Sequence, residues 1–77
     1  MAVTAYVLIN TSPGRAMDVA KSLQNTAGVT VADAITGEYD VIARIEGADV
    51  NAIGGIIVES IQKVEGVFKT VTCLAVT

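Results

Sequence analysis

The sequence predicts a small α+β domain of four strands and two helices, in the order strand, helix, strand, strand, helix, strand. Two segments, residues 16–23 and 50–64, repeat apolar residues at helical spacing. A glycine-containing turn, residues 36–40, divides the chain near its middle. The remaining segments are rich in Val, Ile and Thr, as strands are, and cover residues 3–9, 29–35, 41–46 and 67–76.

The first strand and the first helix are expected near the N-terminus. Val3 to Ile9 is apolar on both alternating faces, with Tyr6 and Leu8 on one of them. Ser12-Pro13 predicts a helix start, because Ser caps helices well and Pro suits the first helical position. Gly28 is expected to end this helix. Its apolar stripe consists of Ala16, Val19, Ala20 and Leu23.

The second and third strands are expected at Val29 to Ile35 and Val41 to Glu46. Asp33 falls on the same alternating face as Val29 and Val31, so that face is not uniformly apolar. Between the strands, Gly37 supplies the backbone angles of a tight reversal, and Asp40 can accept hydrogen bonds from nearby amides. The two strands should therefore form a hairpin.

The second helix is expected to begin after Asp49, a good N-cap, and to end at Gly66. Two adjacent glycines inside it cost about 1 kcal/mol each relative to Ala. We expect Gly54 to pack closely against the sheet, whereas the sequence suggests no role for Gly55. The last strand runs from Val67 to Val76. The buried stripe of the helix is expected to consist of Val50, Ile53, Ile57, Ile61 and Val64.

The βαββαβ order with short connections is the split-βαβ pattern of a ferredoxin-like domain. Right-handed crossovers then place both helices on one face of a four-stranded antiparallel sheet, and residues 1–77 form a single domain. Because the first, third and last strands are apolar on both sides, a second copy should cover the other face and give a dimeric αβ sandwich. The expected dimer interface comprises Tyr6, Leu8, Ile42, Arg44, Phe68 and Leu74.

Composition excludes several classes of function. The chain has no His and a single Cys, so an internal disulfide, a metal site and an activated nucleophile are not expected, and Cys73 should be a small core residue. The net charge of -3 and five unclustered basic residues argue against direct nucleic-acid binding. No apolar run approaches the roughly 20 residues of a membrane span, and no signal peptide is evident. We expect a cytoplasmic protein that is not an enzyme and uses no cofactor.

The central turn is the best candidate for a binding site. Backbone N–H groups projected by a tight glycine turn bind carboxylates well. A carboxylate at Glu38 or Asp40 can pair with an ammonium group, and an α-amino acid carries both groups on one carbon. A solvated turn without any ligand explains the same residues, so both interpretations stay open at this point.

Residues 36–42, Thr-Gly-Glu-Tyr-Asp-Val-Ile, together with Val64-Glu65-Gly66-Val67 and Thr70-Val71-Thr72, resemble the ligand-sensing (RAM) domain of the Lrp/AsnC, or feast/famine, transcription regulators. The resemblance extends from Val3 to Val76. The usual member of this family carries an N-terminal helix-turn-helix domain, which this sequence lacks. The resemblance is therefore to stand-alone members of the family.

The resemblance implies a ferredoxin-like fold and dimers that form through sheet faces and assemble into octamers or decamers. It also implies an amino acid or related metabolite bound between dimers, and mixed assembly with a full-length regulator. Asp40 would orient the turn or pair with the ammonium group. The matching ligand contacts in this sequence are Thr36, Gly37, Glu38, Tyr39 and Asp40, with Thr70 and Thr72 as further contacts.

Two other classes share the predicted order of elements. An ACT-like regulatory module also binds amino acids at interfaces, but favours a glycine-rich first loop that Ser12-Pro13-Gly14 matches only faintly. A small dimeric ferredoxin-like enzyme needs a polar cavity with a catalytic side chain, often His or Trp, and this sequence contains neither residue.

Overall fold

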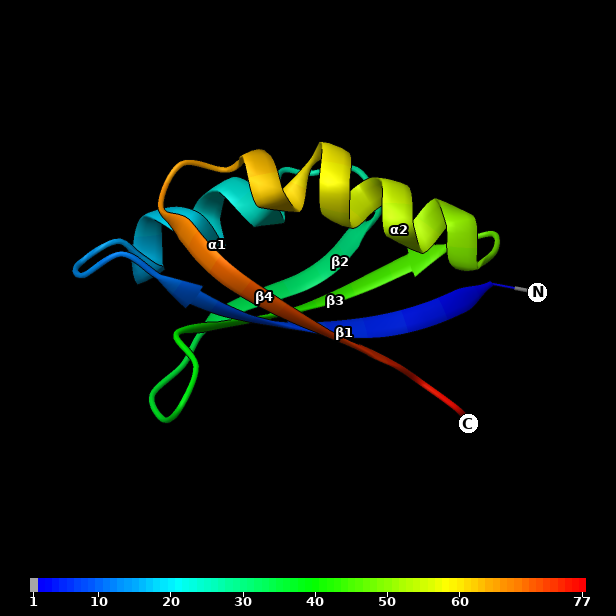
Figure 1. Ribbon diagram of the computed structural model, residues 1–77, viewed down its shortest axis with the longest axis horizontal. Helices are drawn as coiled ribbons and strands as arrows, with labels where there is room; N and C mark the ends of the chain where they lie inside the picture. Colours follow the sequence, from blue (N-terminus) through cyan, green and yellow to red (C-terminus); the bar gives the residue numbers. More distant parts are fainter. Residues whose placement is uncertain (1) are drawn as a thin grey trace.

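The computed structural model describes residues 2–77 and confirms the predicted order of elements (Figure 1). A short 3₁₀ helix, η1, follows the second helix and is the one addition to the expected order. The elements are β1 (Val3–Thr11), α1 (Ala16–Gln24), β2 (Val29–Ala34), β3 (Val41–Gly47), α2 (Val50–Glu59), η1 (Ile61–Lys63) and β4 (Val67–Leu74).

The four strands form one antiparallel sheet in the order β2-β3-β1-β4, so β2 and β4 are its edges. Both helices cover the same face of this sheet (Figure 1). The hairpin expected between the second and third strands is confirmed, because β2 and β3 are antiparallel neighbours. Within residues 2–77, no helix is long and apolar enough to cross a membrane.

The hydrophobic core lies between the helices and the sheet. The alternation read from the sequence is confirmed in both central strands, because three alternate residues of each strand face the core and are fully buried. The buried residues of these strands are Ala5, Val7 and Ile9 in β1 and Val41, Ala43 and Ile45 in β3. The helical layer contributes Val19, Ala20 and Leu23 from α1, Ile53 and Ile57 from α2, and Ile61 from η1.

The expected start of the first helix is wrong. The helix begins at Ala16, its N-cap is Arg15, and no side chain caps it. Gly14 has φ +78, outside the helical region, and separates Ser12-Pro13 from the helix. The Ser12 N–H instead donates to the Gly66 carbonyl at 2.9 Å. Ser12 therefore joins the loop before α1 to the loop before β4.

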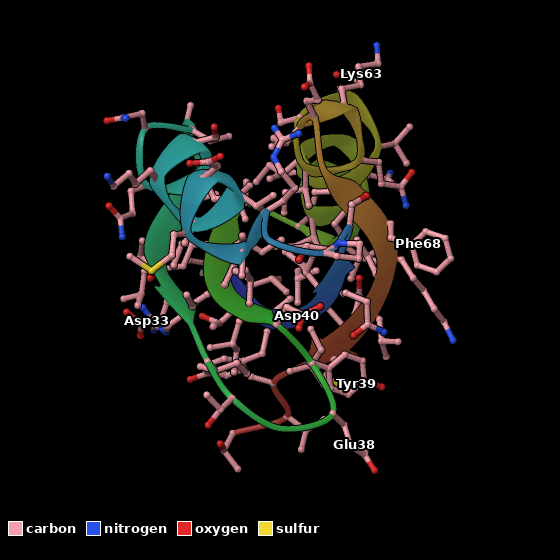
Figure 2. The ribbon with its side chains drawn as sticks, turned by 90° about the vertical axis from the view of Figure 1, so that its left-hand side faces the viewer. Asp33, Glu38, Tyr39, Asp40, Lys63 and Phe68 are labelled. Carbon is pink, nitrogen blue, oxygen red and sulfur yellow. The ribbon has the colours of Figure 1, made fainter. Side chains whose placement is uncertain are left out.

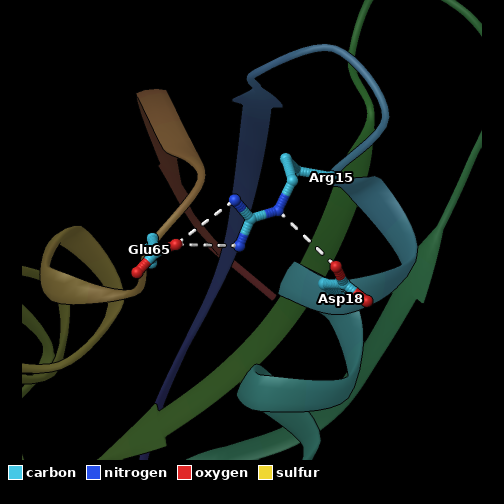
Figure 3. A network of polar contacts seen from close by, with 3 residues as sticks. All are labelled: Arg15, Asp18 and Glu65. Carbon is cyan, nitrogen blue, oxygen red and sulfur yellow. Dashed lines mark hydrogen bonds and ion pairs between the residues drawn. The ribbon is translucent and has the colours of Figure 1, made fainter.

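Arg15 strengthens the same connection. One guanidinium nitrogen, Nη1, lies 3.3 Å from Glu65 Oε1, and Nε lies 3.5 Å from Asp18 Oδ2 (Figure 3).

The expected end of the first helix at Gly28 is also wrong. The helix ends at Gln24, after which the Asn25 and Thr26 N–H groups donate to carbonyls of the last turn. Gly28 comes later, directly before β2.

The N-cap of the second helix is confirmed, because Asp49 Oδ1 accepts a hydrogen bond from the Ala52 N–H at 2.8 Å. The predicted stripe holds for Ile53, Ile57 and Ile61, and Val64 packs at the margin of the core. The assignment of Val50 to this buried stripe is wrong, because 58% of its surface is exposed. The helix ends at Glu59 rather than at Gly66, because the chain tightens into η1.

Two further expectations are corrected. A Cβ added to Gly54 or Gly55 would meet nothing within 4 Å, so Gly54 does not pack closely against the sheet. Cys73 is exposed rather than buried, because it lies opposite Tyr6 on the sheet face that the helices leave open. β4 ends at Leu74, two residues before the predicted end of the last strand.

The open space around Gly54 predicts that Gly54→Ala stabilises the protein. Alanine removes the conformational cost of glycine and clashes with nothing, so the free energy of unfolding should rise by about 1 kcal/mol. Urea denaturation at one fixed protein concentration measures this change. Gly66→Ala is the matched control and should destabilise, because Gly66 has φ +100 and its Cβ would lie 3.1 Å from Val19 Cγ2. A destabilising Gly54→Ala would contradict the prediction.

Candidate functional site

The loop between β2 and β3 projects from the sheet on the side opposite the helices (Figures 1 and 2). It contains the predicted ligand-binding residues Thr36 to Asp40. Gly37 has φ +138, which L side chains rarely adopt, although its Cβ position is open. Glycine is therefore needed here for backbone conformation and not for space.

Asp40 fixes the base of this loop to the end of β1. Its Oδ2 accepts a hydrogen bond from the Thr11 N–H at 2.8 Å, and the Thr11 hydroxyl lies 3.4 Å away. The Asp40 N–H donates to the Ile9 carbonyl, and its own carbonyl accepts from the Ile35 N–H, both at 2.9 Å. Of the two roles expected for Asp40, the geometry assigns Oδ2 to orienting the loop.

The tip of the loop keeps its polar groups available. Within residues 2–77, no hydrogen bond uses the backbone N–H groups of residues 36–39. Glu38 is exposed at the tip and points away from the body of the protein, whereas Tyr39 is half-buried (Figure 2). The loop therefore combines free amide donors with an exposed carboxylate.

Thr70 and Thr72 do not join this loop within one chain. They lie opposite Ile9 and Val7, on the side of β4 that faces the helices, and Thr70 Oγ1 accepts a hydrogen bond from Gln62 Nε2 at 3.3 Å. Asp40 and Thr70 flank Ile9 from opposite sides, about 10 Å or two strand spacings apart. One chain thus brings together only the residues of the loop.

Thr70 instead lines a hollow of about 340 Å³ at the start of β4. Its other lining residues are Gln62, Val67, Phe68 and Lys69. Sequence reasoning missed Gln62 and Lys69, because neither residue belongs to an apolar stripe or to a recognisable motif. Only the packing of η1 beside β4 places them together.

The sheet surface opposite the helices, here called the open face, remains uncovered. It has a shallow hollow of about 150 Å³, and the register shows which side chains share the face. Its residues are Val31 and Asp33 of β2, Ile42, Arg44 and Glu46 of β3, Thr4, Tyr6, Leu8 and Asn10 of β1, and Lys69, Val71 and Cys73 of β4.

Four of the six predicted interface residues, Tyr6, Leu8, Ile42 and Arg44, lie on the open face. Leu74 does not lie on the open face, because the register places it opposite the buried Ala5, on the side that the helices cover. Phe68 is 79% exposed and projects sideways from the start of β4 (Figure 2). It lies beside the register shift between Asn10 and Thr11.

The charged side chains of the open face differ in whether they have an ion-pair partner. Arg44 Nη1 lies 2.7 Å from Glu46 Oε2. Hydrogen bonding to the side chain of Tyr6 and the charge of Glu46 raise the pKa of Arg44. Asp33 and Lys69 form no ion pair with any residue of the described chain, 2–77. No group of metal-ligating side chains was found among these residues.

The contacts of Asp40 predict that Asp40→Ala destabilises the fold. Loss of the carboxylate leaves the Thr11 N–H without its acceptor, so the free energy of unfolding should fall by about 1 to 2 kcal/mol. Glu38→Ala is the control from the same loop and should change stability by less than about 0.5 kcal/mol. Equal stability of the two variants in urea denaturation would show that the Asp40–Thr11 contact does not hold the loop.

The chain is similar to a known family over almost its whole length. The model of the Lrp/AsnC ligand binding domain matches residues 4–77. An uncharacterized HTH-type transcriptional regulator from Pyrococcus furiosus is 28% identical over 97% of this chain and 52% of its own length. This chain thus spans about half of that relative, which is described as a regulator and not as an enzyme.

Solved structures agree with this match. A hypothetical protein from Pyrococcus horikoshii has a TM-score of 0.89 at 31% identity, covering 97% of this chain and 90% of the other. A transcriptional regulator from Neisseria meningitidis, solved as a complex with L-Met, has a TM-score of 0.85 at 19% identity, covering 97% and 50%. The resemblance seen in the sequence is confirmed, and the chain belongs to the Lrp/AsnC ligand binding domain family.

Proposed function

We propose that this chain is an effector-binding and oligomerisation module that binds an amino acid, or a related metabolite, at residues 36–40. The observation that carries the proposal is the pair of features at this loop. Its backbone amides are free, and the Asp40–Thr11 contact holds its base in place. The matching family model describes a ligand binding domain, which supports a ligand for this chain.

The proposed ligand carries a carboxylate and an ammonium group. The carboxylate accepts hydrogen bonds from the N–H groups of residues 37–39, which donate to no other group of the described chain. The ammonium group pairs with Glu38, the exposed carboxylate of the same loop. The L-Met complex of the regulator from Neisseria meningitidis supports this ligand class, although that protein shares only 19% identity.

A single chain supplies only part of the proposed site, because Thr70 and Thr72 lie on the helix side of β4. We propose that a second chain completes it. Chains would first pair through their open faces, whose exposed apolar residues include Val31, Tyr6 and Cys73. The pairs would then assemble into octamers or decamers, with the ligand held between them.

The family also supports a role in transcription regulation. This chain spans about half of the curated relative, and its net charge of -3 does not favour contact with DNA. We therefore propose that it acts through other chains, including mixed assembly with a full-length Lrp/AsnC regulator. Its ligand would then change the size of the assembly or its stability.

The proposal predicts that at least one amino acid stabilises the assembly. Melting temperature and solution mass by light scattering should be measured with each of the twenty amino acids in turn. A ligand at 100 times its Kd adds about 2.7 kcal/mol to the free energy of unfolding, which is easily detected. Glu38→Ala should abolish the response while leaving the fold intact. A wild-type protein that ignores every amino acid would contradict the proposed ligand class.

The proposed pairing predicts that Ile42→Glu converts the dimer to a monomer. Glutamate at this half-buried position would place an unpaired charge inside the interface. Val58→Glu is the matched control, because Val58 is 58% exposed on α2, on the other side of the molecule. Sedimentation equilibrium measures the mass of each variant. An Ile42→Glu dimer of unchanged stability would exclude pairing through the open face.

A further inference from the structure

We propose that the outer edge of β2 binds an extended peptide segment of another protein, which adds an antiparallel strand to the sheet. The segment alternates apolar and basic side chains. Its apolar side chains enter a hollow between β2 and α1, and its basic side chain pairs with Asp33. The site is separate from the loop of residues 36–40, so the inference goes beyond the proposed effector function.

The outer edge of β2 carries backbone groups that no neighbouring strand uses, because β2 is the first strand in the sheet order. Successive residues of an antiparallel pair alternately bond to the neighbouring strand and point away from it. The Ile35 N–H donates to the Asp40 carbonyl on the β3 side, so Asp33 also bonds toward β3. Ala32 and Ala34 therefore direct their N–H and C=O groups outward.

Gln24 of α1 agrees with this direction and uses only one of the outward groups. Its Nε2 donates to the Ala32 carbonyl at 2.9 Å, from the side away from β3. In the described chain, the Ala32 N–H and both backbone groups of Ala34 stay available to a further strand. Exposed strand edges of this kind pair readily with an extended peptide.

A hollow of about 280 Å³ lies beside this edge, between β2 and α1. Its lining includes Met17, Ala20 and Lys21 of α1 and Ala32 and Ala34 of β2. Ala20 and Ala32 are small and buried, and the flexible Met17 side chain is exposed at the hollow. Residues of an added strand that pair with Ala32 and Ala34 point to the same side of the sheet as these alanines. Their side chains would therefore fill the hollow.

Two charges determine which peptide side chains face which way. Asp33 lies at the outer side of the sheet, below α1, and Lys21 lines the hollow (Figure 2). Neither side chain forms an ion pair with any residue from 2 to 77. A basic peptide residue opposite Asp33 gains an attractive pair, whereas a shift by one residue would place it beside Lys21. The expected segment is therefore apolar, basic, apolar opposite Ala34, Asp33 and Ala32.

A second copy of this chain suits the edge less well than a short peptide does. Two β2 edges paired around Asp33 would place like charges opposite each other. The register of β2 also shifts between Val29 and Val31, and such irregularities oppose edge-to-edge association of whole sheets. A short segment needs only the regular part of the strand, which follows Val31.

A synthetic peptide tests the charge pattern. Fluorescein-labelled Ser-Thr-Val-Lys-Leu-Thr-Ser amide should bind in fluorescence polarisation with a Kd below about 1 mM. Replacing its Lys by Glu should raise the Kd about fivefold, because the new charge meets Asp33. The preference should reverse with Asp33→Lys. Glu59→Lys, which makes the same charge change on the exposed surface of α2, should keep the wild-type preference.

Methylation of the peptide backbone tests strand addition. An N-methyl group on the peptide Val removes the N–H that donates to the Ala34 carbonyl, so the Kd should rise about tenfold. N-methylation of the peptide Lys is the matched control, because the N–H of the residue opposite Asp33 points away from β2. That peptide should bind as the unmodified one does. Equal binding of the two methylated peptides would overturn strand addition.

The remaining outcomes separate this inference from its alternatives. No binding of the unmodified peptide at about 1 mM, or no reversal with Asp33→Lys, would overturn the proposal. Sedimentation analysis should show the peptide bound to an assembly of unchanged size. A peptide that dissociates the assembly would assign the edge to a second copy and also overturn the proposal. Glu38→Ala, which should abolish the response to amino acids, should leave peptide binding unchanged, so the two proposals fail independently.

Discussion

The two central strands of the sheet carry apolar residues on both faces, and most other features of the molecule depend on this property. Both central strands place fully buried residues under the helices and carry Tyr6, Leu8 and Ile42 on the opposite side. Two short helices cover one face only (Figure 1). Antiparallel sheets that face water are normally polar on that side, which is the reason for proposing that a second chain covers this face. In the proposed dimer, association would add to the stability of each chain.

The loop of residues 36–40 is attached to the same two-faced sheet. Asp40 holds its base through Thr11 and Ile9 of β1, a strand whose opposite edge pairs with β4. Ligand recognition and association would thus share β1 as a common support. This arrangement gives a physical basis for linking effector binding to assembly, because a change at the loop base is also a change at the strand that carries Tyr6 and Leu8.

The sequence identified the strands and the core of β1 and β3, because alternation and β-branched residues carry that information directly. It could not decide which face of β4 is the open one, since that strand is apolar on both sides. Leu74 and Cys73 were therefore assigned to the wrong faces, and only pairing with β1 determines them. The start of the first helix was predicted too early in the chain, because Ser12 and Pro13 match the local residue preferences for a helix start. The positive φ of Gly14 and the bond from Ser12 to Gly66 override it.

The candidate loop could be identified from its sequence, but its geometry could not be predicted from the sequence. The sequence suggested Asp40 for two roles, and its bond to Thr11 involves residues 29 positions apart, which no local pattern reveals. Asp33 stood out as a charge on an otherwise apolar face.

The direction of β1 gives the molecule two structurally different ends. The strand starts near the N-terminus and ends beside the loop of residues 36–40 (Figure 1). Its nine residues span about 30 Å. A signal from the loop to anything attached at the N-terminus would then travel as a rigid displacement along a hydrogen-bonded strand.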